Sequence, residues 1–200
     1  MMKNILYKII SPVLFVFIIS PAFTRVTSLD SSIKEIKSSF NKNYNIEQSG
    51  TGKVEMLEYS AAVFRKNPAL LSYEEYSFKS KKFDYVKRAG KYFKRIALGI
   101  YHFNNPDEIK KALHVFLEGH EVNPQKFYKE GKHPALSPPF LVLIKDSTLL
   151  FFYAKCGDIP HKKDWDKFTD TYIKIFRYHF PEPEGEIIRC YCSGPIFLVK

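Results

Sequence analysis

The first clear pattern along the chain is a set of apolar residues at helical spacing. Residues 29–44 place Ile33, Ile36 and Phe40 on one side of a helix, which is typical of an amphipathic helix packed on a core. The polar stretch at residues 41–53 is predicted to break that helix.

A second helical pattern follows, although it is less regular. Residues 53–66 have apolar residues at helical spacing, and Asn67-Pro68 ends the element. Because proline suits the first turn of a helix, a further helix is predicted over residues 69–78.

The middle of the chain alternates between strand and helix signals. Phe83, Tyr85 and Lys87 alternate, Ala89-Gly90 can form a turn, and a second strand is predicted over residues 91–103. Asn105 is placed to cap a following helix that ends at Gly119. The apolar face predicted for that helix comprises Ile109, Ala112, Leu113, Phe116 and Leu117.

The C-terminal third predicts a buried hairpin, a helix and one or two strands. Residues 140–156 turn at Asp146-Ser147 and are apolar at consecutive positions, so both faces of this hairpin should be covered. A helix is predicted over residues 163–180, and strand structure over 187–200. Strands and helices therefore come in groups, which predicts a single-domain α+β fold with helices packed on a mostly antiparallel sheet.

The N-terminus has the layout of a secretory signal peptide. Lys3 and Lys8 precede an apolar run of 11 residues at 9–19, and Ser20-Pro21-Ala22 supplies small residues for cleavage after Ala22. The run is shorter than the roughly 20 residues of a membrane-spanning helix. We expect residues 1–22 to be removed, residues 23–200 to form the domain, and the protein to be exported to the periplasm or beyond the cell. The alternative is an uncleaved anchor.

Charge is concentrated in one segment. The chain carries +10, and residues 78–95 hold eight Lys or Arg against one Asp, interleaved with aromatics. This pattern predicts a binding surface for a polyanion, either an acidic protein or an anionic envelope polymer. Export argues against intracellular nucleic acid. The alternative is a half-buried hairpin whose aromatics face the core. The candidate binding residues are Lys81, Lys82, Lys87, Arg88, Lys91, Lys94 and Arg95.

The three cysteines predict one disulfide. Cys190 and Cys192 are two residues apart on a predicted strand, so they share a face and cannot readily bond each other. In an oxidising compartment a bond from Cys156 to either of them is expected. One alternative is that all three thiols are unbonded and mostly buried. Another is a zinc site that adds His161, which has suitable ligand types but an unusual spacing. We predict no metal and no cofactor.

Catalytic motifs are sparse. Asp158, His161 and Asp164 form a small acid–base cluster near Asp166, which suits proton transfer. The alternative is helix initiation, because acidic residues stabilise the first turn. His102, at the end of a predicted strand, is a further candidate.

These patterns favour a small exported interaction protein that is not an enzyme. An inhibitor, an immunity protein or an envelope-binding accessory would each fit a basic surface that carries aromatic residues. Two alternatives stay open: a secreted hydrolase that uses the Asp158–Asp166 segment, and a carrier with an apolar pocket.

Overall fold

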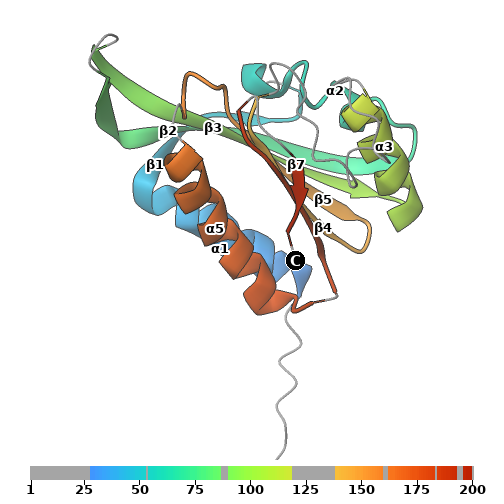
Figure 1. Cartoon of the computed structure of the whole chain (residues 1–200). Coiled ribbons are helices and arrows are strands. Elements are labelled where there is room, and N and C mark those ends of the chain that lie inside the picture. The colour runs from blue at the N-terminus through green and yellow to red at the C-terminus, as the bar shows by residue number, and fades with distance from the viewer. Residues whose placement is uncertain are drawn as a thin grey trace, which may run out of the picture.

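Seven antiparallel strands form one sheet through the middle of the molecule (Figure 1). The computed structural model describes residues 28–52, 54–86, 90–118, 138–159, 162–182, 184–192 and 196–199. The strand order is β1-β2-β3-β5-β4-β6-β7. The strands are β1 (Tyr44–Gly50), β2 (Leu70–Val86), β3 (Gly90–Phe103), β4 (Phe140–Lys145), β5 (Thr148–Tyr153), β6 (Glu186–Cys190) and β7 (Ile196–Leu198).

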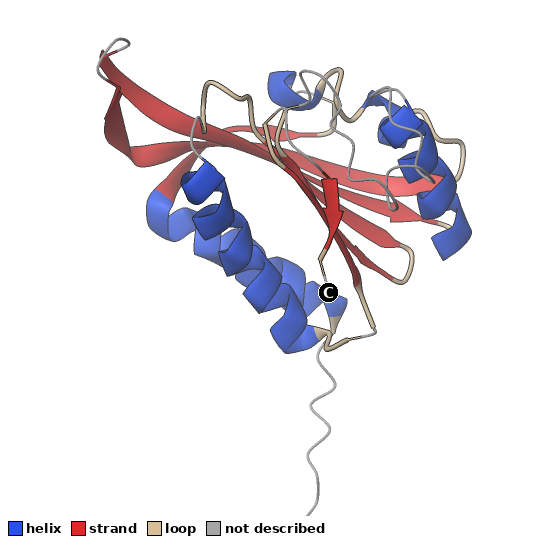
Figure 2. Ribbon diagram, in the orientation of Figure 1, coloured by secondary structure: helices blue, strands red, loops and turns tan. Residues whose placement is uncertain are grey.

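Helices cover both faces of the sheet, as Figure 2 shows. On one face lie α1 (Leu29–Asn43) and α5 (Lys162–His179). On the other lie a 3-10 turn (Glu55–Leu57), α2 (Ala62–Arg65) and α3 (Pro106–Glu118). The predicted single-domain α+β fold is confirmed, and the predicted signal peptide at residues 1–22 lies outside the described residues.

Strand alternation separates the core into two layers. Along β3, Ala97 and Tyr101 pack toward α2 and α3, whereas Leu98 and Ile100 pack toward α1 and α5. β4 and β5 alternate in the same way and are almost wholly buried. The prediction that this apolar hairpin is covered on both faces is therefore confirmed.

Side-chain caps mark two of the helix starts. The Ser28 hydroxyl accepts a hydrogen bond from the Ser31 amide at 3.2 Å, and the Asn105 side chain accepts one from the Glu108 amide at 3.1 Å. Each cap satisfies an amide that has no partner within its own helix. The five apolar residues predicted for the α3 face are all buried.

One prediction in the N-terminal half was wrong, and one strand was not predicted. Within the predicted helix at residues 69–78, Leu70 onward forms the first part of β2. The polar stretch at 41–53 does end the first helix, at Asn43, but it also contains β1. β2 pairs along its length with the apolar strand β3, and this tertiary pairing overrides the local helical spacing. β1 is an edge strand with exposed side chains, so it has no apolar alternation to detect.

A buried ion pair joins α2 to the sheet. Glu75 in β2 is completely buried, and its two carboxylate oxygens lie 3.1 and 3.0 Å from Nη1 of Arg65. The Tyr101 hydroxyl donates to Glu75 at 2.7 Å. Burial and the adjacent carboxylate raise the pKa of Tyr101 far above its usual range, so the phenol stays a donor. Full pairing is what makes a buried carboxylate tolerable.

The disulfide joins Cys156 to Cys192. β6 ends at Cys190, so Cys192 lies beyond the strand instead of on its face as predicted. Cys190 is buried, and its thiol donates to the Tyr191 carbonyl at 3.3 Å. A disulfide suggests an oxidising, exported location. Within the described ranges, no helix is long and apolar enough to cross a membrane.

Gly99→Ala should destabilise the protein. A Cβ at Gly99 would overlap the ring of Tyr101 and push its hydroxyl away from Glu75. We expect the free energy of unfolding to fall by about 1–3 kcal/mol, measured by urea denaturation. Gly157→Ala is the control, because a Cβ there meets open space. Equal stability of the two variants would contradict the role assigned to Tyr101.

Reduction of the disulfide should also lower stability. Cys156 and Cys192 are 36 residues apart, and closing a loop of that length restricts the unfolded chain by about 4 kcal/mol on the chain-entropy estimate. Urea denaturation with and without reductant measures the difference. A Cys156→Ser/Cys192→Ser variant that loses no stability would show that the bond does not hold the fold.

Candidate functional site

The far ends of β2 and β3 form a two-stranded arm that extends past the helices (Figure 1). We define the arm as residues 81–86 and 90–95. β1 flanks β2 only as far as Ser80, and β5 flanks β3 only from Ala97. Gly90 has a φ of 74°, a conformation that favours glycine, as expected from the predicted turn. The arm therefore leaves the sheet as a free ribbon.

A wide bulge marks the root of the arm. The register runs from the pair Lys79–Arg95 to the pair Phe83–Phe93, so residues 80–82 lie opposite Lys94 alone. The Ser80 hydroxyl fills this gap: it accepts from the Lys94 amide at 2.9 Å and donates to the Lys82 carbonyl at 2.7 Å. Bulges bend a strand and re-aim its side chains, and this one presents Lys81 and Lys82 at the surface.

Aromatic rings and lysines hold the arm together. The rings of Phe83 and Phe93 meet edge to face at 6.4 Å. The ammonium of Lys91 lies 4.6 Å from the Phe83 ring, and that of Lys79 lies 4.5 Å from the Phe93 ring. Two-stranded ribbons are marginally stable alone, and these cation–π contacts supply local support.

Two aromatic side chains on the arm face solvent. Phe83 is 49% exposed and Tyr85 is 72% exposed, whereas Phe78, before the bulge, is 1% exposed. The alternative that the aromatics of this hairpin face the core is therefore correct for Phe78 and wrong for Phe83 and Tyr85. The arm presents apolar surface and positive charge together.

Ion pairs tie the root of the arm to its neighbours. Nζ of Lys94 lies 2.9 Å from Asp84 on the arm and 3.5 Å from Asp164 on α5. Partial burial lowers the pKa of Lys94, but the two carboxylates outweigh it and raise that pKa above its usual value. Arg95 pairs with Glu47 of β1 at 3.1 Å.

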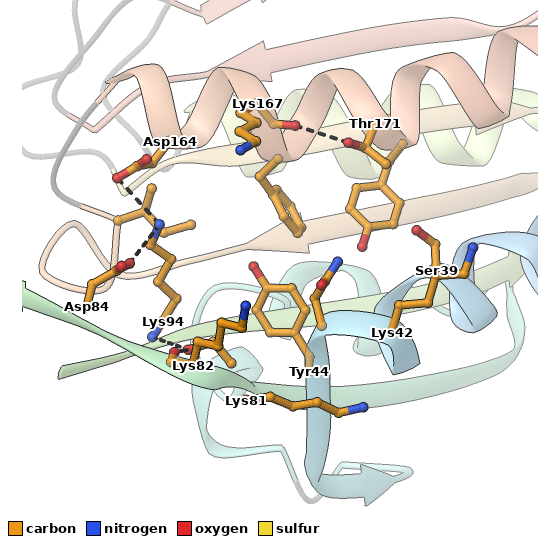
Figure 3. A pocket seen from close by; sticks show the side chains of 15 residues that line it. Ser39, Lys42, Tyr44, Lys81, Lys82, Asp84, Lys94, Asp164, Lys167 and Thr171 are labelled. Carbon is orange, nitrogen blue, oxygen red and sulfur yellow. Dashed lines mark hydrogen bonds and ion pairs between the residues drawn. The ribbon is translucent and has the colours of Figure 1, made fainter.

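A cleft of about 460 Å³ lies between the root of the arm and helices α1 and α5 (Figure 3). Five lysines and two aspartates line it, leaving a net charge of +3. The aromatic residues at the cleft are Tyr44, Phe168 and Tyr172. This size is within the range of small-molecule sites.

The predicted binding residues divide between the arm and the cleft. Lys81, Lys82 and Lys94 line the cleft, and Lys91 and Arg95 make the arm contacts given above. Lys87 and Arg88 lie outside the described residues. Sequence reasoning missed the helical side of the cleft, which contains Lys42 in α1 and Lys167 in α5. Neither lysine carries a signal that distinguishes it from an ordinary helix-surface residue.

Asp158, Asp164 and Asp166 of the predicted acid–base cluster lie among the described residues. Asp164 pairs with Lys94, whereas Asp166 accepts from the Tyr191 hydroxyl at 2.5 Å and lies 3.5 Å from Arg189. Burial and that hydrogen bond raise the pKa of Tyr191 to about 12. Partial burial raises the pKa of Asp158. His161 lies outside the described residues.

His102 lies at the opposite end of β3 from this segment. It pairs with Thr148, five residues along the strand from the pair Ala97–Tyr153, which corresponds to roughly 17 Å. Its Nδ1 atom is 2.9 Å from the Thr148 hydroxyl oxygen. His102 lines a smaller cavity of about 330 Å³ in which Lys37 and Glu74 form an ion pair of 2.6 Å.

The zinc alternative loses two of its four proposed ligands to the disulfide, because Cys156 and Cys192 are bonded to each other. Across the part of the chain that the structure describes, no group of three or more His, Cys, Asp or Glu side chains could hold a metal ion.

Ser80→Ala should loosen the arm without unfolding the sheet. The substitution leaves the Lys94 amide and the Lys82 carbonyl without the hydroxyl that satisfies them. We expect hydrogen exchange at the Lys94 amide to accelerate about tenfold, as the loss of one hydrogen bond implies. Ser72→Ala, an exposed position earlier in β2, is the control. Unchanged exchange at Lys94 would contradict the role of Ser80.

Comparison of the chain with protein-family models, with curated proteins and with solved structures found no match.

Proposed function

We propose that this protein is an exported interaction protein, not an enzyme, and that it binds an acidic protein through its arm. The observation that carries the proposal is the exposure of Phe83 and Tyr85 on a projecting ribbon that also bears Lys81, Lys82 and Lys91. Aromatic side chains provide the largest contributions at protein interfaces. The surrounding lysines would speed association with an acidic surface.

The aromatic residues favour a protein over an anionic envelope polymer. A polyanion can be held by charge alone, through the release of its counterions. Exposed rings add affinity where a partner offers an apolar recess to receive them. A projecting ribbon also suits insertion into a groove of the partner, as expected of an inhibitor or an immunity protein.

The proposed location is the periplasm or the extracellular space. The signal-like N-terminus and the Cys156–Cys192 bond both support export. The two alternative functions, a secreted hydrolase and a carrier with an apolar pocket, have less support than the interaction protein. The carboxylates of a hydrolase site are engaged in separate ion pairs, and charged side chains line both cavities, which does not suit an apolar ligand.

Charge reversal on the arm should abolish partner binding. The test variant is Lys81→Glu/Lys82→Glu/Lys91→Glu, used as bait against exported proteins of the producing organism. The control variant, Lys110→Glu/Lys163→Glu/Lys174→Glu, makes the same charge change at exposed helix positions. We expect an acidic protein retained by the wild type and the control to bind the arm variant at least about tenfold more weakly. Added salt should weaken the binding of this acidic protein to the wild type.

Circular dichroism confirms that each variant is folded before binding is compared. A partner that binds the arm variant as tightly as the control variant would overturn the proposal. Retention of an anionic polymer in place of a protein would contradict the proposed class of partner.

A further inference from the structure

The lysines of the cleft differ in whether other groups of the protein already interact with their ammonium groups. Lys94 lies between two carboxylates, and Lys81 donates to the Asn41 carbonyl at 2.6 Å. Lys42, Lys82 and Lys167 form no ion pair with any described residue. The cleft therefore concentrates positive charge that the described part of the chain leaves uncompensated.

These three lysines come from three separate elements. Lys42 is in the last turn of α1, Lys82 is in the bulge of β2, and Lys167 is on α5. Figure 3 shows Lys82 extending from the strand side of the cleft and Lys167 from the helix above it. An anion between these walls would be approached by ammonium groups from different directions.

Phenol groups add neutral donors to the same space. The hydroxyl of Tyr44 points into the cleft in Figure 3, and Tyr172 lines the same cleft. Burial raises the pKa of each phenol, so both keep their protons at neutral pH. Tyr172 interacts with Ser39, whereas the Tyr44 hydroxyl has no hydrogen-bond partner among the described residues. Tyr44 can therefore donate to a bound oxygen.

We infer that the cleft binds the tetrahedral oxyanion of a phosphate-bearing ligand. Its cationic groups are all lysines. A planar carboxylate is best recognised by the rigid fork of an arginine, whereas lysines act as separate point charges that suit a phosphate. A phosphate carries up to two negative charges at neutral pH. The volume of about 460 Å³ leaves room for an organic group beside the phosphate.

Calorimetric titration at fixed ionic strength tests the inference. The probes are inorganic phosphate, glycerol phosphate and acetate. We expect both phosphates to bind at least about tenfold more tightly than acetate, because a doubly charged anion gains more from several ammonium groups. Lys167→Gln should weaken phosphate binding about tenfold. Tyr44→Phe should weaken it severalfold, since it removes one donor.

Lys174→Gln is the matched control, because Lys174 is exposed two turns further along α5 and does not line the cleft. Its affinity for phosphate should equal that of the wild type. Absence of phosphate binding, equal affinity for acetate, or equal loss in the Lys167 and Lys174 variants would each overturn the inference.

A vesicle-binding experiment identifies the source of the phosphate. Flotation with vesicles of phosphatidylcholine, with and without phosphatidylglycerol, asks whether a lipid headgroup can enter the cleft. Binding that requires phosphatidylglycerol and Lys167 assigns the site to a lipid phosphate. Binding to glycerol phosphate without vesicle binding assigns it to a soluble ligand.

The inference does not depend on the proposed protein partner. Lys167 and Tyr44 lie outside the arm, whereas the partner test alters Lys81, Lys82 and Lys91. Failure of the phosphate titration therefore leaves the arm proposal standing, and failure of partner capture leaves the phosphate site standing.

Discussion

The burial of β3, β5 and β4 on both faces is the constraint on which the rest of the structure depends. Leu98 and Phe152 need cover on one side of the sheet, and Tyr101 and Phe151 need it on the other. Helices α1 and α5 cover the face that carries Leu98 and Phe152, and α2 and α3 cover the face that carries Tyr101 and Phe151. Because β5 pairs with β3 only from Ala97 onward, the earlier part of β3 must leave the sheet together with β2.

The arm is consequently stabilised by different interactions from those of the core. It has contacts such as Lys91 on Phe83 and Lys94 with Asp84, where the core has packed rings such as Phe40 on Phe78 at 4.0 Å. Exposed ion pairs contribute at most about 1 kcal/mol each. The arm can therefore adjust to a partner at low cost, while Phe78 and Ile96, where β2 and β3 enter the sheet, are buried in the core.

The sequence predicts the parts of the fold in which local pattern and tertiary environment agree. Residues 140–153, α3 and α5 were identifiable because their apolar residues match their final burial. β1 and the start of β2 were not, because pairing across the sheet determines them. The cleft could not be predicted from the sequence either, because tertiary packing creates it. Lys82 and Lys167 are 85 positions apart in sequence, and only the packing of α5 beside the bulge places them on one cavity.

The arm and the cleft are electrostatically coupled, because Lys82 belongs to both. An anion held between Lys82 and Lys167 would cancel positive charge at the root of the arm, and an acidic partner on the arm would draw on the same lysine. If both ligands bind, each must therefore weaken the other, and thermodynamic linkage requires the two factors to be equal. Recognition of the partner by the arm therefore depends on whether the cleft is occupied.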